Sequence, residues 1–158
     1  MKQLRRLFFL ALIGLLAGCA ATGPVFTPHR EPTDKEARIY IYRPFRAVHQ
    51  LGGPDIAIGE RYLTTLLNKG YAVAYVPAGP SKIAAKGNIL KNWSFRDVSV
   101  EPNLMAGRTY FVRLVPGLGG IVPLGSMTQI TYTEELSLVD PKIAESEIAA
   151  CQLLYADK

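Results

Sequence analysis

The chain has 158 residues, a hydrophobic fraction of 49% and a formal net charge of +5. This size and composition fit one folded domain and exclude a disordered chain. Three of the positive residues lie within the first six positions, and the other Lys and Arg residues are scattered along the chain. Because no basic stripe is formed, the charge excludes a nucleic-acid-binding protein as the class to expect.

Residues 1–18 have the three parts of a secretory signal. Lys2, Arg5 and Arg6 precede an apolar run over 7–16, and small residues follow it. As a helix, the span from position 7 to position 18 would be about 18 Å long, against roughly 30 Å for a bilayer core. We therefore expect a signal peptide rather than a transmembrane helix.

The end of this signal, Leu16–Cys19, resembles the lipobox of bacterial lipoproteins. The resemblance implies cleavage between Gly18 and Cys19 and acylation of Cys19, so that lipid on this residue joins the protein to a membrane. Ala20 and Ala21 replace the aspartate that keeps many lipoproteins at the inner membrane. An outer membrane location facing the periplasm is therefore expected. The alternative is a conventional secretory signal with a chance cysteine.

Residues 19–36 form the next segment, which we predict to be an extended tether. Pro24, Pro28 and Pro32 recur in it, and proline removes a backbone donor and fixes φ. His29 lies in this segment and His49 in a later loop. Neither has cysteine or carboxylate neighbours at ligand spacing, so both are predicted to be solvated rather than to bind a metal.

Residues 37–138 show the alternation and turn signals of a β-domain. Ile39 and Ile41 fall on one face of the first strand, and Tyr40 and Tyr42 fall on the other. Residues 68–70 predict a hairpin between the strands on either side of them, closed by a left-handed glycine. Strands are expected over the following ranges: 37–43, 55–58, 63–67, 71–76, 81–86, 93–100 with a break near 96–97, 109–115 and 128–134.

The pattern changes to that of a helix in residues 139–158. Asp140 followed by Pro141 is typical of a helix N-terminus. Ala144, Ile148, Cys151 and Tyr155 then recur at helical spacing and predict one apolar face. The expected fold is thus mainly β, an antiparallel β-sandwich of about seven short strands with one C-terminal α-helix.

Four stretches in order resemble a family of small bacterial lipoproteins that carry domain of unknown function 2846. They are Ala37–Pro44, Asn68–Tyr71, Pro77–Gly79 and Ala106–Arg113. Two turns depart from the family pattern, with Gly59-Glu60 where the family has Asp-Gly and with Pro80 where it has a basic residue. The resemblance implies a β-sandwich on a lipid anchor and brings no catalytic residue or cofactor.

A glycine-rich segment over 117–125 is the most unusual part of the sequence. It lacks the Lys-Ser/Thr pair that a phosphate-binding loop needs. A flexible connection between two strands is the favoured interpretation. The sharper hypothesis is that Leu118, Ile121, Val122 and Leu124 form an exposed apolar patch for a partner.

Little else in the sequence predicts chemistry. Glu134 and Glu135 alternate across a strand and make no acid–base pair, and Cys151 on the helix face is predicted to be a buried thiol. No catalytic residue, metal site or cofactor is predicted. We expect a non-enzymatic envelope protein that binds a protein or peptidoglycan. Two alternatives stay open, an accessory subunit of an envelope or secretion assembly and a hydrolase of an envelope polymer.

Overall fold

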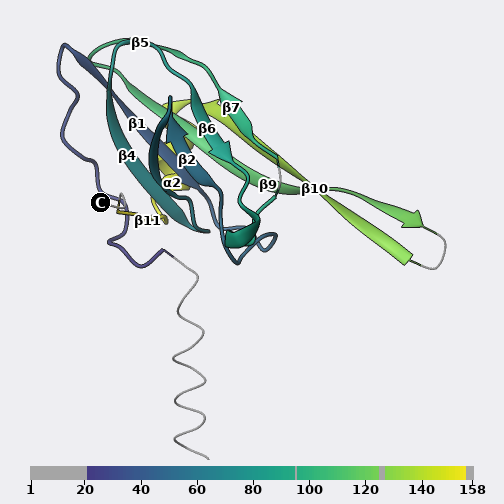
Figure 1. The fold of residues 1–158 in the computed structure, drawn as a ribbon. Coiled ribbons are helices and arrows are strands. Elements are labelled where there is room, and N and C mark those ends of the chain that lie inside the picture. The colour runs from purple at the N-terminus through teal and green to yellow at the C-terminus, as the bar shows by residue number, and fades with distance from the viewer. Residues whose placement is uncertain (1–20, 95, 125–126, 156–158) are drawn as a thin grey trace, which may run out of the picture.

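The computed structural model describes residues 21–94, 96–124 and 127–155, and it confirms a mainly β fold with one C-terminal helix. Two sheets pack face to face (Figure 1). Sheet A has the order β10-β9-β1-β4-β11, and sheet B has the order β3-β2-β6-β7. Most pairings are antiparallel, whereas β1 pairs with β9 and β4 pairs with β11 in parallel.

The elements have the following bounds. Sheet A consists of β1 (Glu36–Arg43), β4 (Gly70–Pro77), β9 (Thr109–Leu124), β10 (Met127–Val139) and β11 (Gln152–Leu153). Sheet B consists of β2 (Asp55–Ile58), β3 (Arg61–Thr65), β6 (Ile83–Lys86) and β7 (Val98–Val100). Two short strands, β5 (Gly79–Pro80) and β8 (Asn103–Leu104), pair separately, and η2 (Ile89–Lys91) and α2 (Pro141–Ile148) are helical.

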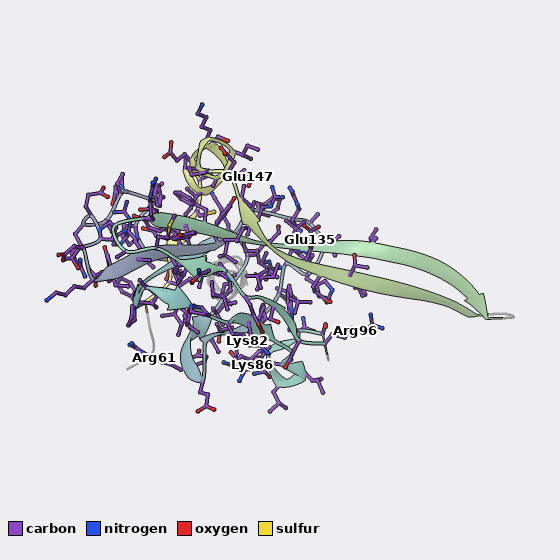
Figure 2. The ribbon with its side chains drawn as sticks, turned by 90° about the horizontal axis from the view of Figure 1, so that it is seen from above. Arg61, Lys82, Lys86, Arg96, Glu135 and Glu147 are labelled. Atoms are coloured by element: carbon purple, nitrogen blue, oxygen red, sulfur yellow. The ribbon has the colours of Figure 1, made fainter. Side chains whose placement is uncertain are left out.

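The central strand β1 is buried on both of its faces. Ile39 and Ile41 belong to the core between the two sheets, as predicted from their alternation. Tyr40 and Tyr42 lie on the opposite face, in a second cluster with residues of α2. This arrangement places β1 in the middle of three layers, with sheet B on one side and α2 on the other. Figure 2 shows the outer layers through Glu147 of α2 on one side and through Lys86 of β6 and the neighbouring Lys82 on the other.

Helix α2 begins as the sequence predicts and is fixed to sheet A by one carboxylate. The Asp140 side chain accepts a hydrogen bond from the Lys142 amide, and Pro141 occupies the first turn. Glu147 accepts hydrogen bonds from the Tyr42 hydroxyl at 2.6 Å and from Arg113 at 2.8 Å. Because these partners lie on two strands of sheet A, Glu147 sets the position of the helix on the sheet.

The predicted apolar helix face is shorter than expected. Ala144 and Ile148 are buried in the helix, but the helix ends at Ile148. Cys151 lies beyond it and is buried, and the chain then forms β11, which the sequence did not predict. Tyr155 is 69% exposed, so it does not belong to the buried face.

Residues 21–36 are extended, but they lie on the domain instead of forming a free tether. The amide of Phe26 donates to the Cys151 carbonyl at 2.9 Å, and its ring contacts Tyr40 and Tyr71 edge to face. Arg38 of β1 donates hydrogen bonds to the carbonyls of His29 and Arg30. The sequence expectation missed these contacts because they join the segment to residues far along the chain.

Two local expectations are wrong. The turn over 68–70 does not close a hairpin, because β3 pairs with β2 in sheet B while β4 pairs with β1 in sheet A. The chain crosses there from one sheet to the other, with the left-handed residue at Lys69 (φ 59) rather than at Gly70. The strand expected from residue 93 begins only at Val98, and Trp93 is a buried loop residue.

Candidate functional site

The most prominent feature of the surface is a two-stranded arm, which we define as residues 116–124 of β9 with residues 127–134 of β10. The last residue of β9 that pairs with β1 is Arg113. Beyond it, β10 is the only one of the described strands that pairs with β9. Figure 1 shows the arm projecting from the body as a ribbon. At about 3.3 Å per residue, nine residues of β9 reach about 30 Å.

The structure corrects the expectation of a flexible connection over 117–125. Residues 117–124 continue strand β9 and are paired with β10, and Tyr132 lies opposite Leu118. The register shifts between Thr131 and Tyr132, which leaves Gly119 as the extra residue of a bulge. Bulges increase local twist, so this one turns the outer part of the arm relative to its root.

All four residues of the predicted apolar patch lie in this one strand of the arm. Leu118 is 63% exposed, and Tyr132, which lies opposite it, is 43% exposed. In the register, Ile121 lies opposite Ile130, and Leu124 lies opposite Met127. The positions sequence reasoning singled out are therefore brought together on one projecting element.

The arm carries no formal charge over a long stretch. Residues 116–133 include no Asp, Glu, Lys or Arg. Proteins usually protect exposed strand edges with charged residues, and a two-stranded ribbon alone is marginal in water. Within residues 116–124 of β9, the only residues that lack a backbone N–H donor are Pro116 and Pro123. An uncharged ribbon of this kind is suited to pairing with, or packing against, another surface.

The root of the arm is fixed by a loop that the sequence did not connect with it. The ring of His49 contacts the ring of Trp93 at 4.9 Å and that of Tyr132 at 4.4 Å. Burial lowers the pKa of His49, an effect that the charge of Glu134 opposes. Both His49 Nε2 and Glu134 Oε1 are buried and have no hydrogen-bond partner among the described residues. The expectation that His49 is solvated is therefore wrong.

Arg43 holds this loop in place from beneath. Its side chain is fully buried, and it donates hydrogen bonds to the carbonyls of Gly52 at 2.9 Å and of His49. Its guanidinium lies 4.6 Å from the centre of the Trp93 ring. Burial lowers the pKa of Arg43 to about 10, so the group stays charged at neutral pH. Backbone carbonyls and a ring face, rather than a carboxylate, thus stabilise this cation.

A groove of about 680 Å³ lies between the open edges of the two sheets. Ile58, Leu63 and Ala74 supply apolar surface, and Arg61 and Lys82 are also among its lining residues. On the described part of sheet A, β11 covers the outer edge of β4 only at Gly70 and Tyr71. The lining includes cations and no carboxylate, so the groove suits an apolar or anionic group better than acid–base chemistry.

The remaining candidate residues are placed as follows. Gly18 and Cys19 lie outside the described residues. Cys151 is buried and free, and burial raises the pKa of its thiol to about 12. Its thiol is therefore protonated at neutral pH, which is the state of an inert structural cysteine. His29 is also packed, edge-on to Tyr40 and Tyr71, and not solvated as expected.

Within 21–94, 96–124 and 127–155, no three His, Cys, Asp or Glu side chains are grouped so that they would hold a metal ion. No helix in these ranges has the length and hydropathy needed to cross a bilayer.

Comparison with known proteins identifies the family. Residues 33–123 match the family model described as a protein of unknown function, DUF2846. Because this match covers more than half of the chain, the protein belongs to that family. The curated proteins and the solved structures gave no match. The matched region runs from the start of the sandwich into the arm, and it leaves out the return strand β10 and helix α2.

Proposed function

We propose that this protein is a lipid-anchored component of the bacterial cell envelope that binds a partner protein through the arm. The observation that carries the proposal is the arm itself, a ribbon that has no charged residue over 116–133 and extends beyond the body. The sequence analysis left open a general binding module and a subunit of an envelope assembly, and these two functions require different binding surfaces. A projecting ribbon favours the assembly subunit.

The lipid anchor is proposed from the sequence at Leu16–Cys19. A positive start, an apolar run and the small residues before Cys19 fit a lipobox, with cleavage after Gly18. Two or more acyl chains on Cys19 would hold the protein firmly at a membrane. Because Ala20 and Ala21 follow the cysteine, we propose the outer membrane, facing the periplasm.

The partner is proposed to be a protein that offers a strand edge or an apolar face. Strand addition supplies main-chain hydrogen bonds, and the outer edges of the arm are long enough to make several of them. Burial of Leu118 and Tyr132, both exposed in the free protein, would add apolar contact area.

The test is site-specific photocrosslinking in intact cells. A photoreactive residue at Leu118 should give one defined adduct in the membrane fraction, and the pair Ile121→Ser and Val122→Ser in the same chain should remove it. The matched control places the photoreactive residue at Glu101, an exposed position on the sheet B side of the molecule. Absence of an adduct from Leu118, or the same adduct from both positions, would contradict the proposed role of the arm.

A further inference from the structure

Five segments meet at one end of the sandwich, which we call the loop end. They are residues 21–26, 44–54, 66–70, 87–93 and 149–155. Strand β1 ends here and β4 begins here, because the two strands run antiparallel. Figure 1 shows the purple start of the described chain, β11 and the loops around η2 on this lower side of the body.

Hydrogen bonds join the five segments into one continuous surface. The Phe26 amide donates to the Cys151 carbonyl, and the Gln152 amide donates to the Lys69 carbonyl, both at 2.9 Å. Asn68 makes two hydrogen bonds with the backbone of Arg46, at 2.9 and 3.1 Å. The Asn92 side chain donates to the Leu51 carbonyl at 3.3 Å. The loops therefore form a fixed platform.

The loop end is free of acidic residues. None of its five segments contains Asp or Glu, whereas they contain Arg46, Lys69 and Lys91. Lys91 forms an ion pair at 2.7 Å with Asp55, which lies just outside the loop end at the start of β2. The opposite end of the sandwich carries charges of both signs. The segment before β1, the first residue of β1 and the turn from β2 into β3 hold Glu31, Asp34, Glu36 and Glu60 together with Arg30, Lys35 and Arg61.

The loop end also exposes large apolar side chains from separate loops. Leu90 of η2 is fully exposed at 100%, and its neighbour Ile89 is 59% exposed. Phe45, Leu51 and Val25 are each more than half exposed. These apolar tips are set among Arg46, Lys69 and Lys91, and the acids Asp55 and Asp97 lie only at the margin of the loop end. Such a surface matches one that is anionic outside and apolar beneath, and a phospholipid bilayer has this layering.

The chain also enters the body at this end. Gly23 and Pro24 lie against Leu153, and Ala21 is buried. Cys19 lies two positions before Ala21 in the chain, and two residues span at most about 7 Å. Lipid on Cys19 would therefore hold this end, and not the opposite one, beside the bilayer.

We infer that the loop end is a membrane-contacting face that rests on an anionic phospholipid surface, with Leu90 and its neighbours in the headgroup region. This inference rests on the proposed anchor and specifies the orientation that the anchor imposes. It directs the opposite end, where acidic residues lie among the cations, away from the bilayer.

The test uses protein purified from membranes and reconstituted into vesicles of phosphatidylethanolamine and phosphatidylglycerol that contain brominated lipid. The variant Leu90→Trp places an indole at the loop end. The matched control is Met105→Trp, because Met105 is an apolar side chain that is 56% exposed at the opposite end. The native Trp93 is buried and contributes equally to both variants.

The expected result is that brominated lipid quenches the introduced indole of Leu90→Trp at least threefold more than that of Met105→Trp. Adding Arg46→Gln and Lys69→Gln should reduce the difference. Equal quenching of the two variants would overturn the inference. Mass analysis of the N-terminal peptide from the same preparation tests the anchor separately, so quenching decides the face and the mass decides the acylation.

Discussion

Arg43 shows how much structure one buried side chain supports. Replacement Arg43→Lys keeps the charge but removes the planar fork that reaches the carbonyls of Gly52 and His49. A loss of roughly 2–4 kcal/mol of unfolding free energy is expected, because buried carbonyls lose their donors. Urea unfolding measures this loss. The control Arg46→Lys, at an exposed position, should stay within about 0.5 kcal/mol of the wild type, and an equal loss in both variants would contradict the role of Arg43.

His49 predicts a pH dependence of stability. Because burial lowers the pKa of His49 in the folded protein, the unfolded chain binds more protons below an ordinary pKa of about 6.5. The contribution of His49 is therefore complete above that pH and is lost as the pH falls toward the folded pKa. Replacement His49→Asn suits the left-handed backbone (φ 53) and removes the titrating group.

The quantity that tests the role of His49 is the slope of the unfolding free energy against pH, not the unfolding free energy at one pH. Unfolding free energies measured from pH 7 down to pH 5 should fall less steeply in His49→Asn than in the wild type. Equal slopes would show that the imidazole titrates alike in the folded and unfolded chains. The sequence did not predict this group, because His49, Trp93 and Tyr132 come from three separate segments with no shared motif.

At the scale of elements, the arm should be separable from the body. Leu118 and Tyr132 are paired in the register, so an Asn-Gly turn can join them in place of 119–131, and the contact of Tyr132 with His49 is kept. Because residues 119–124 and 127–131 are strand-paired only with one another among the described strands, the body should lose less than about 1 kcal/mol of unfolding free energy. Urea unfolding followed by circular dichroism measures this, and a loss of several kcal/mol would show that the arm supports the sandwich.

The elements also show where sequence reasoning succeeds and where it does not. The period of β1 and the Asp140–Pro141 start of α2 are local properties, and both are confirmed. The crossing from β3 to β4 was missed. A turn with a left-handed residue occurs both within hairpins and where the chain passes from one sheet to another, so the turn pattern does not distinguish the two cases. The length of β9 was missed because glycine and proline weaken a strand signal, while cross-strand pairing with β10 overrides it.

At the scale of the whole molecule, the sequence predicted the class of fold but not how the segment before the first strand packs on the sandwich. The isoleucine face of β1 is buried against sheet B, and its tyrosine face is buried against α2, so the predicted sandwich and helix together cover both faces. The packing of residues 21–36 on that sandwich depends on contacts with β1 and β11, which no local pattern encodes. The described part of the predicted tether, residues 21–36, is instead part of the domain.

The central claim is that lipid on one cysteine holds this domain at a membrane. Mass spectrometry of the protein purified from its native membrane tests it most directly. The N-terminal peptide should begin at Cys19 and carry the added mass of acyl chains, and Cys19→Ala should shift the protein out of the membrane fraction. An N-terminus elsewhere in the chain, or an unmodified Cys19, would contradict the claim.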